Sequence, residues 1–156
     1  MNHEFYMNLA LEEAKTAFVE TETPIGCVIV SNGIIIGKGH NKTAQMHNPL
    51  YHAEIIAINE ACKNVKDWRL QDATLYVTIE PCPMCAGAIL MSRIETVVFG
   101  AKNPKAGCAG SIYNLLEDTR FNHRVNLAHG VLAEECGGIM TRFFREHLNK
   151  YKEGLS

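Results

Sequence analysis

Two short segments carry residue types that can bind a metal ion and move protons. The sequence HAE covers residues 52–54, and the sequence PCPMC covers residues 81–85. The imidazole of His52 and the thiols of Cys82 and Cys85 are borderline-soft ligands that suit Zn²⁺. The two cysteines are three residues apart, so both sulfur atoms can converge on one ion where a helix begins. The positive end of that helix favours the thiolate form.

The number of ligands separates a catalytic from a structural site. Three protein ligands leave one tetrahedral position for water, which is typical of a catalytic zinc ion. The water then needs a base, and Glu54 is the natural candidate because it lies two residues after His52. Since positions i and i+2 of a regular helix do not face each other, this pairing requires His52 to lie where the helix starts. Pro49 just upstream is consistent with such a start.

Each of these residues has a simpler interpretation when it is taken alone. A C-x-x-C pair can be a redox pair or half of a zinc ribbon, and the ribbon needs a fourth ligand from the other cysteines: Cys27, Cys62, Cys108 or Cys136. Cys27 and Cys62 lie in apolar periodic segments, which favours core positions for both. A single histidine or glutamate at a helix start is typically a capping or dipole-compensating residue. The two motifs together favour the catalytic interpretation.

Composition predicts one folded domain over residues 1–156. The chain is 47% hydrophobic and 21% charged, which excludes disorder as its main state. No apolar run reaches the ~18–20 residues of a membrane span. The first residues include Glu4, Glu12 and Glu13 and do not resemble a signal peptide. We therefore expect a cytoplasmic protein with reduced cysteines and no membrane partner.

Charge is distributed unevenly along a chain whose net charge is −2. Residues 1–23 contain five glutamates and one lysine, whereas residues 141–152 contain four cations and one glutamate. This asymmetry permits a local basic face that could bind nucleic acid, although a solvated C-terminal helix is the simpler interpretation.

The hydrophobic pattern predicts alternating helices and strands. Helices are expected at residues 4–20, 52–64, 82–93, 112–116 and 131–150, and strands at residues 26–30, 34–36, 74–79, 96–99 and 125–128. Asn32-Gly33 predicts a hairpin turn, whereas the last three strands are separated by helices and can run parallel. Gly137-Gly138 argues against a continuous last helix. The order predicts an α/β fold, a three-layer α/β/α sandwich with a five-stranded mixed sheet.

With these two motifs the sequence resembles the zinc-dependent nucleoside and nucleobase deaminases, whose signature is H-x-E followed by P-C-x-x-C. Within that superfamily it is most similar to the bacterial tRNA-specific adenosine deaminases, over nearly the whole chain. Segments that support the similarity include GHN at residues 39–41, WRL at residues 68–70, NHR at residues 122–124 and FF at residues 143–144. The zinc motifs specify the superfamily, whereas the segments after Lys102 indicate the tRNA branch. The resemblance implies a cytidine-deaminase-like fold.

The resemblance also implies an activity. His52, Cys82 and Cys85 would bind one Zn²⁺ per subunit, and Glu54 would act as the proton shuttle. The reaction would be hydrolytic deamination of adenosine to inosine at the wobble position of a tRNA anticodon, using water activated by zinc. The implied partners are the tRNA anticodon stem-loop and a second copy of the chain, in a homodimer.

Four further residues would contact the substrate. Asn41 resembles the residue that hydrogen-bonds the nucleotide, and Ala53 would supply backbone at the pocket floor. Asn103 stands where many relatives carry Asp, which removes a negative charge and adds a donor near the flipped nucleotide. Phe143 and its neighbour Phe144 could line the pocket, although core packing is the simpler role, and we expect at least one of them to be buried.

Two other functions would use the same motifs. A free nucleobase or nucleoside deaminase, of the guanine or cytidine type, would share the zinc ligands and Glu54 but would not need a surface for an RNA loop. A non-enzymatic zinc protein would have four protein ligands and no use for Glu54.

Overall fold

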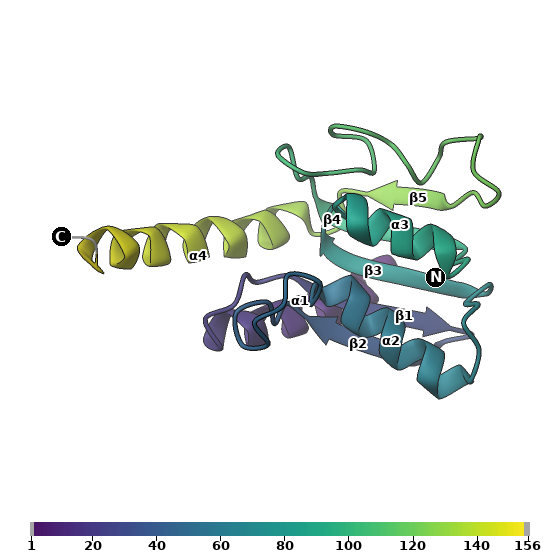
Figure 1. Ribbon diagram of the computed structural model, residues 1–156, viewed down its shortest axis with the longest axis horizontal. Coiled ribbons are helices and arrows are strands. Elements are labelled where there is room, and N and C mark those ends of the chain that lie inside the picture. Colours follow the sequence, from purple (N-terminus) through teal and green to yellow (C-terminus); the bar gives the residue numbers. More distant parts are fainter. Residues whose placement is uncertain (1, 155–156) are drawn as a thin grey trace.

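The computed structural model describes the backbone of residues 2–154 and the side chains of residues 2–147. Its strands form one five-stranded sheet in the order β2-β1-β3-β4-β5 (Figure 1). The strand bounds are β1 (Gly26–Ser31), β2 (Ile34–His40), β3 (Ala73–Ile79), β4 (Thr96–Ala101) and β5 (Asn126–His129). β1 is antiparallel to β2 and β3, whereas β3, β4 and β5 are parallel. Asn32 and Gly33 both have positive φ, which confirms the predicted hairpin turn.

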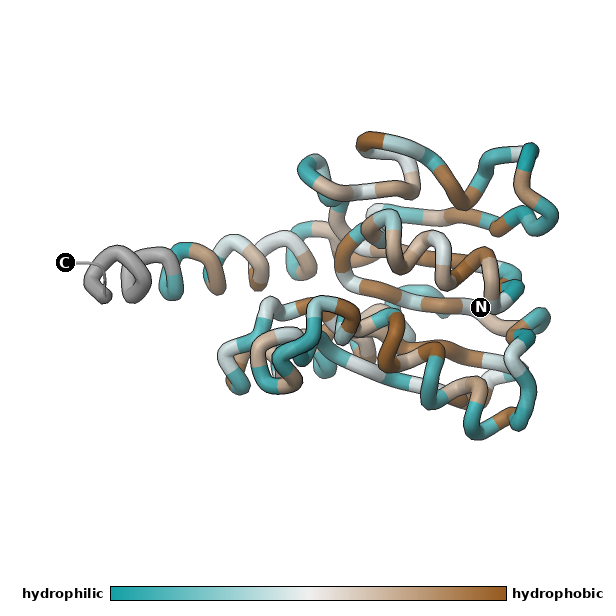
Figure 2. The backbone as a smooth tube through the Cα atoms, viewed as in Figure 1, coloured by the Kyte–Doolittle hydropathy of each residue, from teal (hydrophilic) through white to brown (hydrophobic). Residues whose placement is uncertain are grey.

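Two helices cover each face of the sheet, which confirms the three-layer α/β/α prediction (Figure 1). The helix bounds are α1 (His3–Val19), α2 (Ala53–Val65), α3 (Pro83–Met91) and α4 (Ala133–Gly154). Cys27 and Ile29 point from β1 into the core under α2 and α3, and Val28 and Val30 point to the opposite core under α1 and α4. Figure 2 shows hydrophobic residues concentrated along the central strands. None of the helices among the described residues has the length and apolar character needed to cross a membrane.

The predicted short helix at residues 112–116 is wrong. This segment forms turns and an isolated bridge between Ala109 and Asn114. The N–H groups of Ile112 and Leu115 donate to carbonyls further back than the four residues of a helix, at Gly107 and Cys108. The backbone therefore folds back on the preceding loop.

Two segments that contain glycine continue as regular structure beyond the point where the sequence predicts an interruption. β2 continues past its predicted end at residue 36 because α2 lies directly against it. A Cβ at Gly39 would lie 2.6 Å from the carbonyl oxygen of Ala53, which no side chain allows. In α4 the helix runs without a break through Gly137-Gly138, since Cys136 and Ile139 are buried on either side of the pair and hold it on the sheet.

Candidate active site

The ends of three strands meet at one edge of the sheet. The strand register pairs Gly26 with His40 and Cys27 with Val77, and it pairs Val77 with Phe99. The carboxyl ends of β2, β3 and β4 therefore lie at the same edge of the sheet, with the start of β1 between β2 and β3. Because α2 and α3 both begin at this edge, the two chemical motifs come together although they are about 30 residues apart in the sequence.

His52, Cys82 and Cys85 form the group that could hold a metal ion. Nδ1 of His52 lies 3.5 Å from Sγ of Cys82 and 3.6 Å from Sγ of Cys85, and all three ligand atoms lie within 4.8 Å of one another. A tetrahedral zinc ion with bonds of about 2.3 Å to sulfur and about 2.0 Å to nitrogen places these atoms about 3.5 Å apart. The donor set and its spacing therefore fit Zn²⁺. Among the described side chains no other cluster of three such ligands occurs.

The first residues of α2 and α3 orient the candidate metal-binding side chains, and His52 lies where its helix starts, as the spacing of His52 and Glu54 predicts. His52 is the N-cap residue of α2 and Cys82 is the N-cap residue of α3, and both have extended backbone. The Cys82 thiolate accepts a hydrogen bond from Cys85, which lowers the pKa of Cys82 to about 4. The same hydrogen bond raises the pKa of Cys85. Zn²⁺ binds cysteine as the thiolate, so the hydrogen bond that favours the ionised form of Cys82 also favours its role as a ligand.

Glu54 lies in the first turn of α2, beside the three ligands. It is only 4% exposed, and this burial raises its pKa to about 7. Its carboxyl group also interacts with the thiol of Cys85. A buried carboxyl group next to a metal-ligand cluster is well placed to take up and release a proton.

Asn41 connects β2 to the start of α2. Its Oδ1 accepts the backbone N–H of Ala53 at 2.8 Å, which leaves its amide N–H₂ as the donor group. His52 makes no capping bond itself because its ring faces the cysteines, so Asn41 satisfies one of the free N–H groups of α2. Ala53 is fully buried beneath this contact.

A cavity of about 730 Å³ lies next to His52. Its walls come from the segment before β1, the loop after β2, the ends of β3 and β4, the loop after β4, and α4. The lining residues are Thr23, Ile25, Asn41, Thr43, His52, Ile79, Ala101, Lys102, Asn103, Pro104, Lys105, Gly137, Met140, Thr141 and Phe144. The sequence predicts Asn41 and Asn103 in the pocket and names Phe144 as a residue that could line it, whereas it does not point to the two lysines or to Gly137, Met140 and Thr141.

The structure does not bring Phe143 to this cavity. Phe143 is 7% exposed and packs against Phe18 of α1, with ring centroids 5.7 Å apart. Its neighbour Phe144 is 52% exposed and lines the cavity instead. The docking of α4 on α1 turns Phe143 inward, so Phe144 and not Phe143 faces the cavity.

Glu80 has a role at the site that its sequence motif does not indicate. This buried carboxylate accepts the backbone N–H groups of Asn103, Ala109 and Ser111, each at 3.0 Å, and the hydroxyl of Ser111. Burial opposes its ionisation, but the hydrogen bonds from Ser111 and the backbone prevail and lower the pKa of Glu80. Glu80 thereby holds the loop that carries Lys102, Asn103 and Lys105. The signal available in the sequence was an acid directly after an apolar strand, with no nearby cation.

Comparison with known proteins places this site in a family. Residues 1–147 match the family described as MafB19-like deaminase. The chain is 54% identical to the tRNA-specific adenosine deaminase of Bacillus subtilis, over 96% of this chain and 92% of the relative. The chain belongs to the tRNA-specific adenosine deaminase family. The fold of this deaminase agrees with a solved structure from studies of A-to-I editing by tRNA:A34 deaminases, with a TM-score of 0.83, 38% identity and coverage of 86% of this chain and 98% of that one.

A second structural relative is named for a different substrate, guanine. The guanine deaminase of Bacillus subtilis is 40% identical to this deaminase, but the match covers 65% of this chain and 66% of that one, with a TM-score of 0.63. The similarity to the guanine enzyme is thus less extensive than the similarity to the tRNA enzymes.

Proposed function

We propose that this protein hydrolytically deaminates adenosine to inosine at the wobble position of a tRNA anticodon. The observation that carries the proposal is the cavity itself, which joins the metal-ligand residue His52 to two lysines and an exposed phenylalanine. Identity to tRNA-specific relatives over nearly the whole chain supports the same substrate class.

The proposed cofactor is one Zn²⁺ held by His52, Cys82 and Cys85. When bound, it would act as a Lewis acid and bring the pKa of a coordinated water near neutrality. Glu54 would take a proton from the attacking water and deliver it to N1 of adenine, and would later transfer the second proton to the C6 amino group, which leaves as ammonia. Water oxygen then stays on C6 and the C6–N bond breaks, which yields inosine.

The remaining cavity residues would bind and orient the nucleotide. Asn41 would donate its amide N–H₂ to the nucleotide, and the backbone of Ala53 would lie beneath the base. Asn103 and Phe144 face the same cavity and would contact the ribose or a neighbouring base. Phe143 would contribute only by supporting Phe144 from the core side.

Positive charge at the cavity favours an RNA substrate over a free base. Lys102 and Lys105 are exposed residues that line the cavity next to Asn103. A free nucleobase carries no phosphate for them to neutralise, whereas an anticodon loop does. The bases of such a loop are single-stranded, so turning one out costs less than it does in a duplex. Of the cations expected on the C-terminal helix, Arg142 lies over the ring of Phe18, and the side chains of Lys150 and Lys152 lie outside the described residues.

We further propose that residues 1–156 act as one zinc-dependent deaminase domain, that the protein is a homodimer, and that it works in the cytoplasm. Support for these three points comes from the family resemblance. Size-exclusion chromatography with light scattering tests the dimer, and a mass of one chain would contradict it.

The decisive experiment offers the zinc-loaded protein an anticodon stem-loop with adenosine at the wobble position. Inosine should form, and Glu54→Ala should lower the rate by ~10²–10⁴-fold without a loss of zinc. Free guanine, cytidine and adenosine serve as competing substrates. Turnover of one of these that rivals the stem-loop would favour the alternative, a free nucleobase or nucleoside deaminase. Full activity of the Glu54→Ala variant would contradict the role of Glu54.

A further inference from the structure

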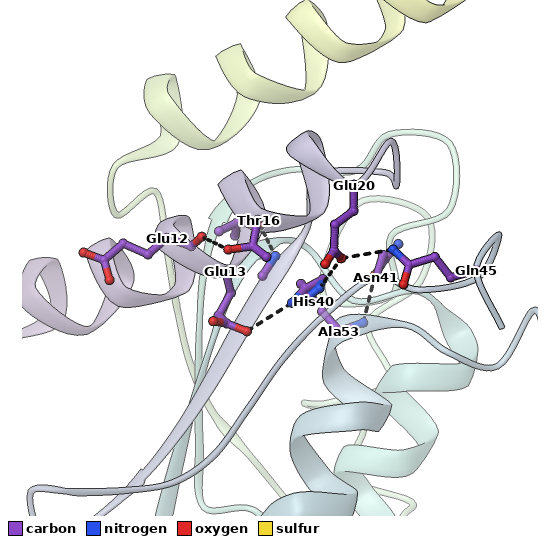
Figure 3. A network of polar contacts seen from close by, with 10 residues as sticks. Glu12, Glu13, Thr16, Glu20, His40, Asn41, Gln45 and Ala53 are labelled. Carbon is purple, nitrogen blue, oxygen red and sulfur yellow. Dashed lines mark hydrogen bonds and ion pairs between the residues drawn. The ribbon is translucent and has the colours of Figure 1, made fainter.

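His40 is the last residue of β2 and is held from two sides by acids of the α1 segment (Figure 3). Its Nδ1 lies 3.2 Å from Oε1 of Glu13, and its Nε2 lies 2.7 Å from Oε1 of Glu20. A carboxylate can only accept a hydrogen bond, so a ring nitrogen of His40 that carries a hydrogen donates to the acid it faces. His40 is only 8% exposed, whereas the side chain of Glu20 is 36% exposed and that of Glu13 20%, so the contact with Glu13 is the better shielded of the two.

The side-chain contacts of His40 add to two backbone anchors at the end of β2, its pairing with Gly26 of β1 and the close packing of Gly39 on α2. β2 is an edge strand that pairs only with β1, and two of its last four residues are glycines. The loop that follows is held by the same acidic segment. Glu20 accepts Nε2 of Gln45 at 3.1 Å, and Glu22 accepts two backbone N–H groups of the loop at 3.0 and 2.7 Å. The acids near the end of α1 therefore hold both β2 and the loop that walls the cavity.

The residue after His40 is Asn41, which reaches the candidate active site. Asn41 is 4% exposed, its Oδ1 accepts the N–H of Ala53, and it lines the cavity beside His52. Figure 3 shows the contacts of His40 and of Asn41 next to each other, one toward α1 and the other toward α2. A shift of His40 would therefore move Asn41 relative to the start of α2.

We propose that His40 is a positioning residue, which the carboxylates of Glu13 and Glu20 hold so that Asn41 meets both Ala53 and the bound nucleotide. The inference rests on the proposed function, because Asn41 can bind a nucleotide only if this cavity takes one. It explains why an acidic helix lies next to a site for an anionic substrate. The carboxylates of Glu13 and Glu20 are directed at the ring of His40, and neither residue lines the cavity.

The first test measures kcat and KM of the zinc-loaded protein on the wobble-adenosine stem-loop for His40→Gln and Glu20→Gln. A glutamine side chain cannot reach both acids, so Asn41 should lose its fixed position. We expect KM to rise ~10-fold, with kcat changed less and zinc content unchanged. The two substitutions remove one shared contact, so combining them should raise KM above that of His40→Gln only by the effect of losing the bond between Glu20 and Gln45.

Glu12→Gln is the matched control, because Glu12 lies on the same helix but points away from His40 (Figure 3). It removes the same charge and should leave KM unchanged. A purely structural role for His40 would lower the melting temperature while KM, measured well below that temperature, stays at the wild-type value. That result would overturn the proposal, as would an equal rise of KM in Glu12→Gln.

A second readout does not depend on activity. Hydrogen exchange of the Ala53 amide should be ~10-fold faster in His40→Gln and Glu20→Gln, while amides in β3 keep their protection. An unchanged Ala53 amide would overturn the proposed positioning even if the enzyme is active. If the wild type does not edit the stem-loop, the proposed function is contradicted. Faster exchange at Ala53 in the two variants would then still support the coupling of His40 to Ala53.

Discussion

Phe143 and Phe144 are consecutive in α4, yet the first is buried against Phe18 and the second lines the cavity. Successive residues of a helix differ by about 100° in direction, so one docking geometry of α4 gives the two rings opposite roles. Arg142 strengthens that geometry because its guanidinium lies 4.5 Å from the ring centre of Phe18.

Substituting each phenylalanine by alanine should separate these roles. Phe143→Ala leaves a cavity between α1 and α4 and should lower the free energy of unfolding by ~3–5 kcal/mol. Phe144→Ala should change it by less than ~1 kcal/mol, but should raise KM for the stem-loop ~10-fold through the loss of a stacking surface. Urea unfolding and steady-state kinetics on both variants check this. A KM increase confined to Phe143→Ala would contradict the assignment.

Phe143 and Phe144 also show which features of the site cannot be predicted from the sequence. The motifs at residues 52–54 and 81–85, the order of the elements and the hairpin at Asn32-Gly33 were predictable because each depends on local spacing or on turn geometry. The direction of Phe144 depends on how α4 docks on α1, which no local pattern encodes. The absent helix at residues 112–116 has a similar cause, since its backbone bonds to the preceding loop.

Glu80→Gln tests how the loop after β4 is held. The amide keeps one acceptor oxygen but replaces the other with a donor, which would face N–H groups that can only donate. We expect the free energy of unfolding to fall by ~1–3 kcal/mol and KM for the stem-loop to rise, because Lys102 and Lys105 lose their fixed positions. Glu117→Gln, at an exposed position, is the control for charge alone. Equal stability of both variants would argue against this role for Glu80.

Cys82→Ser should weaken zinc binding by at least ~100-fold and abolish editing, because a serine hydroxyl is a poor zinc ligand at neutral pH. Cys62→Ser is the control, since this free thiol packs at the margin of the core and not in the ligand cluster. The zinc content of both variants is measured by atomic absorption after dialysis. Retention of one zinc per chain by Cys82→Ser would remove Cys82 from the ligand set.

Asn103→Asp tests how strictly the substrate must be RNA. Oδ1 of Asn103 accepts the N–H of Ala106 at 3.2 Å, and an aspartate would keep that bond while replacing the amide donor with negative charge. We expect the wild type to accept substrates without a 2′-hydroxyl more readily than Asn103→Asp does. The value of kcat/KM on an RNA hairpin divided by that on a matched DNA hairpin should therefore be larger for the variant. Asn8→Asp, an exposed position on α1, adds the same charge elsewhere and should leave the ratio unchanged. If Asn103→Asp also leaves it unchanged, Asn103 does not read the sugar.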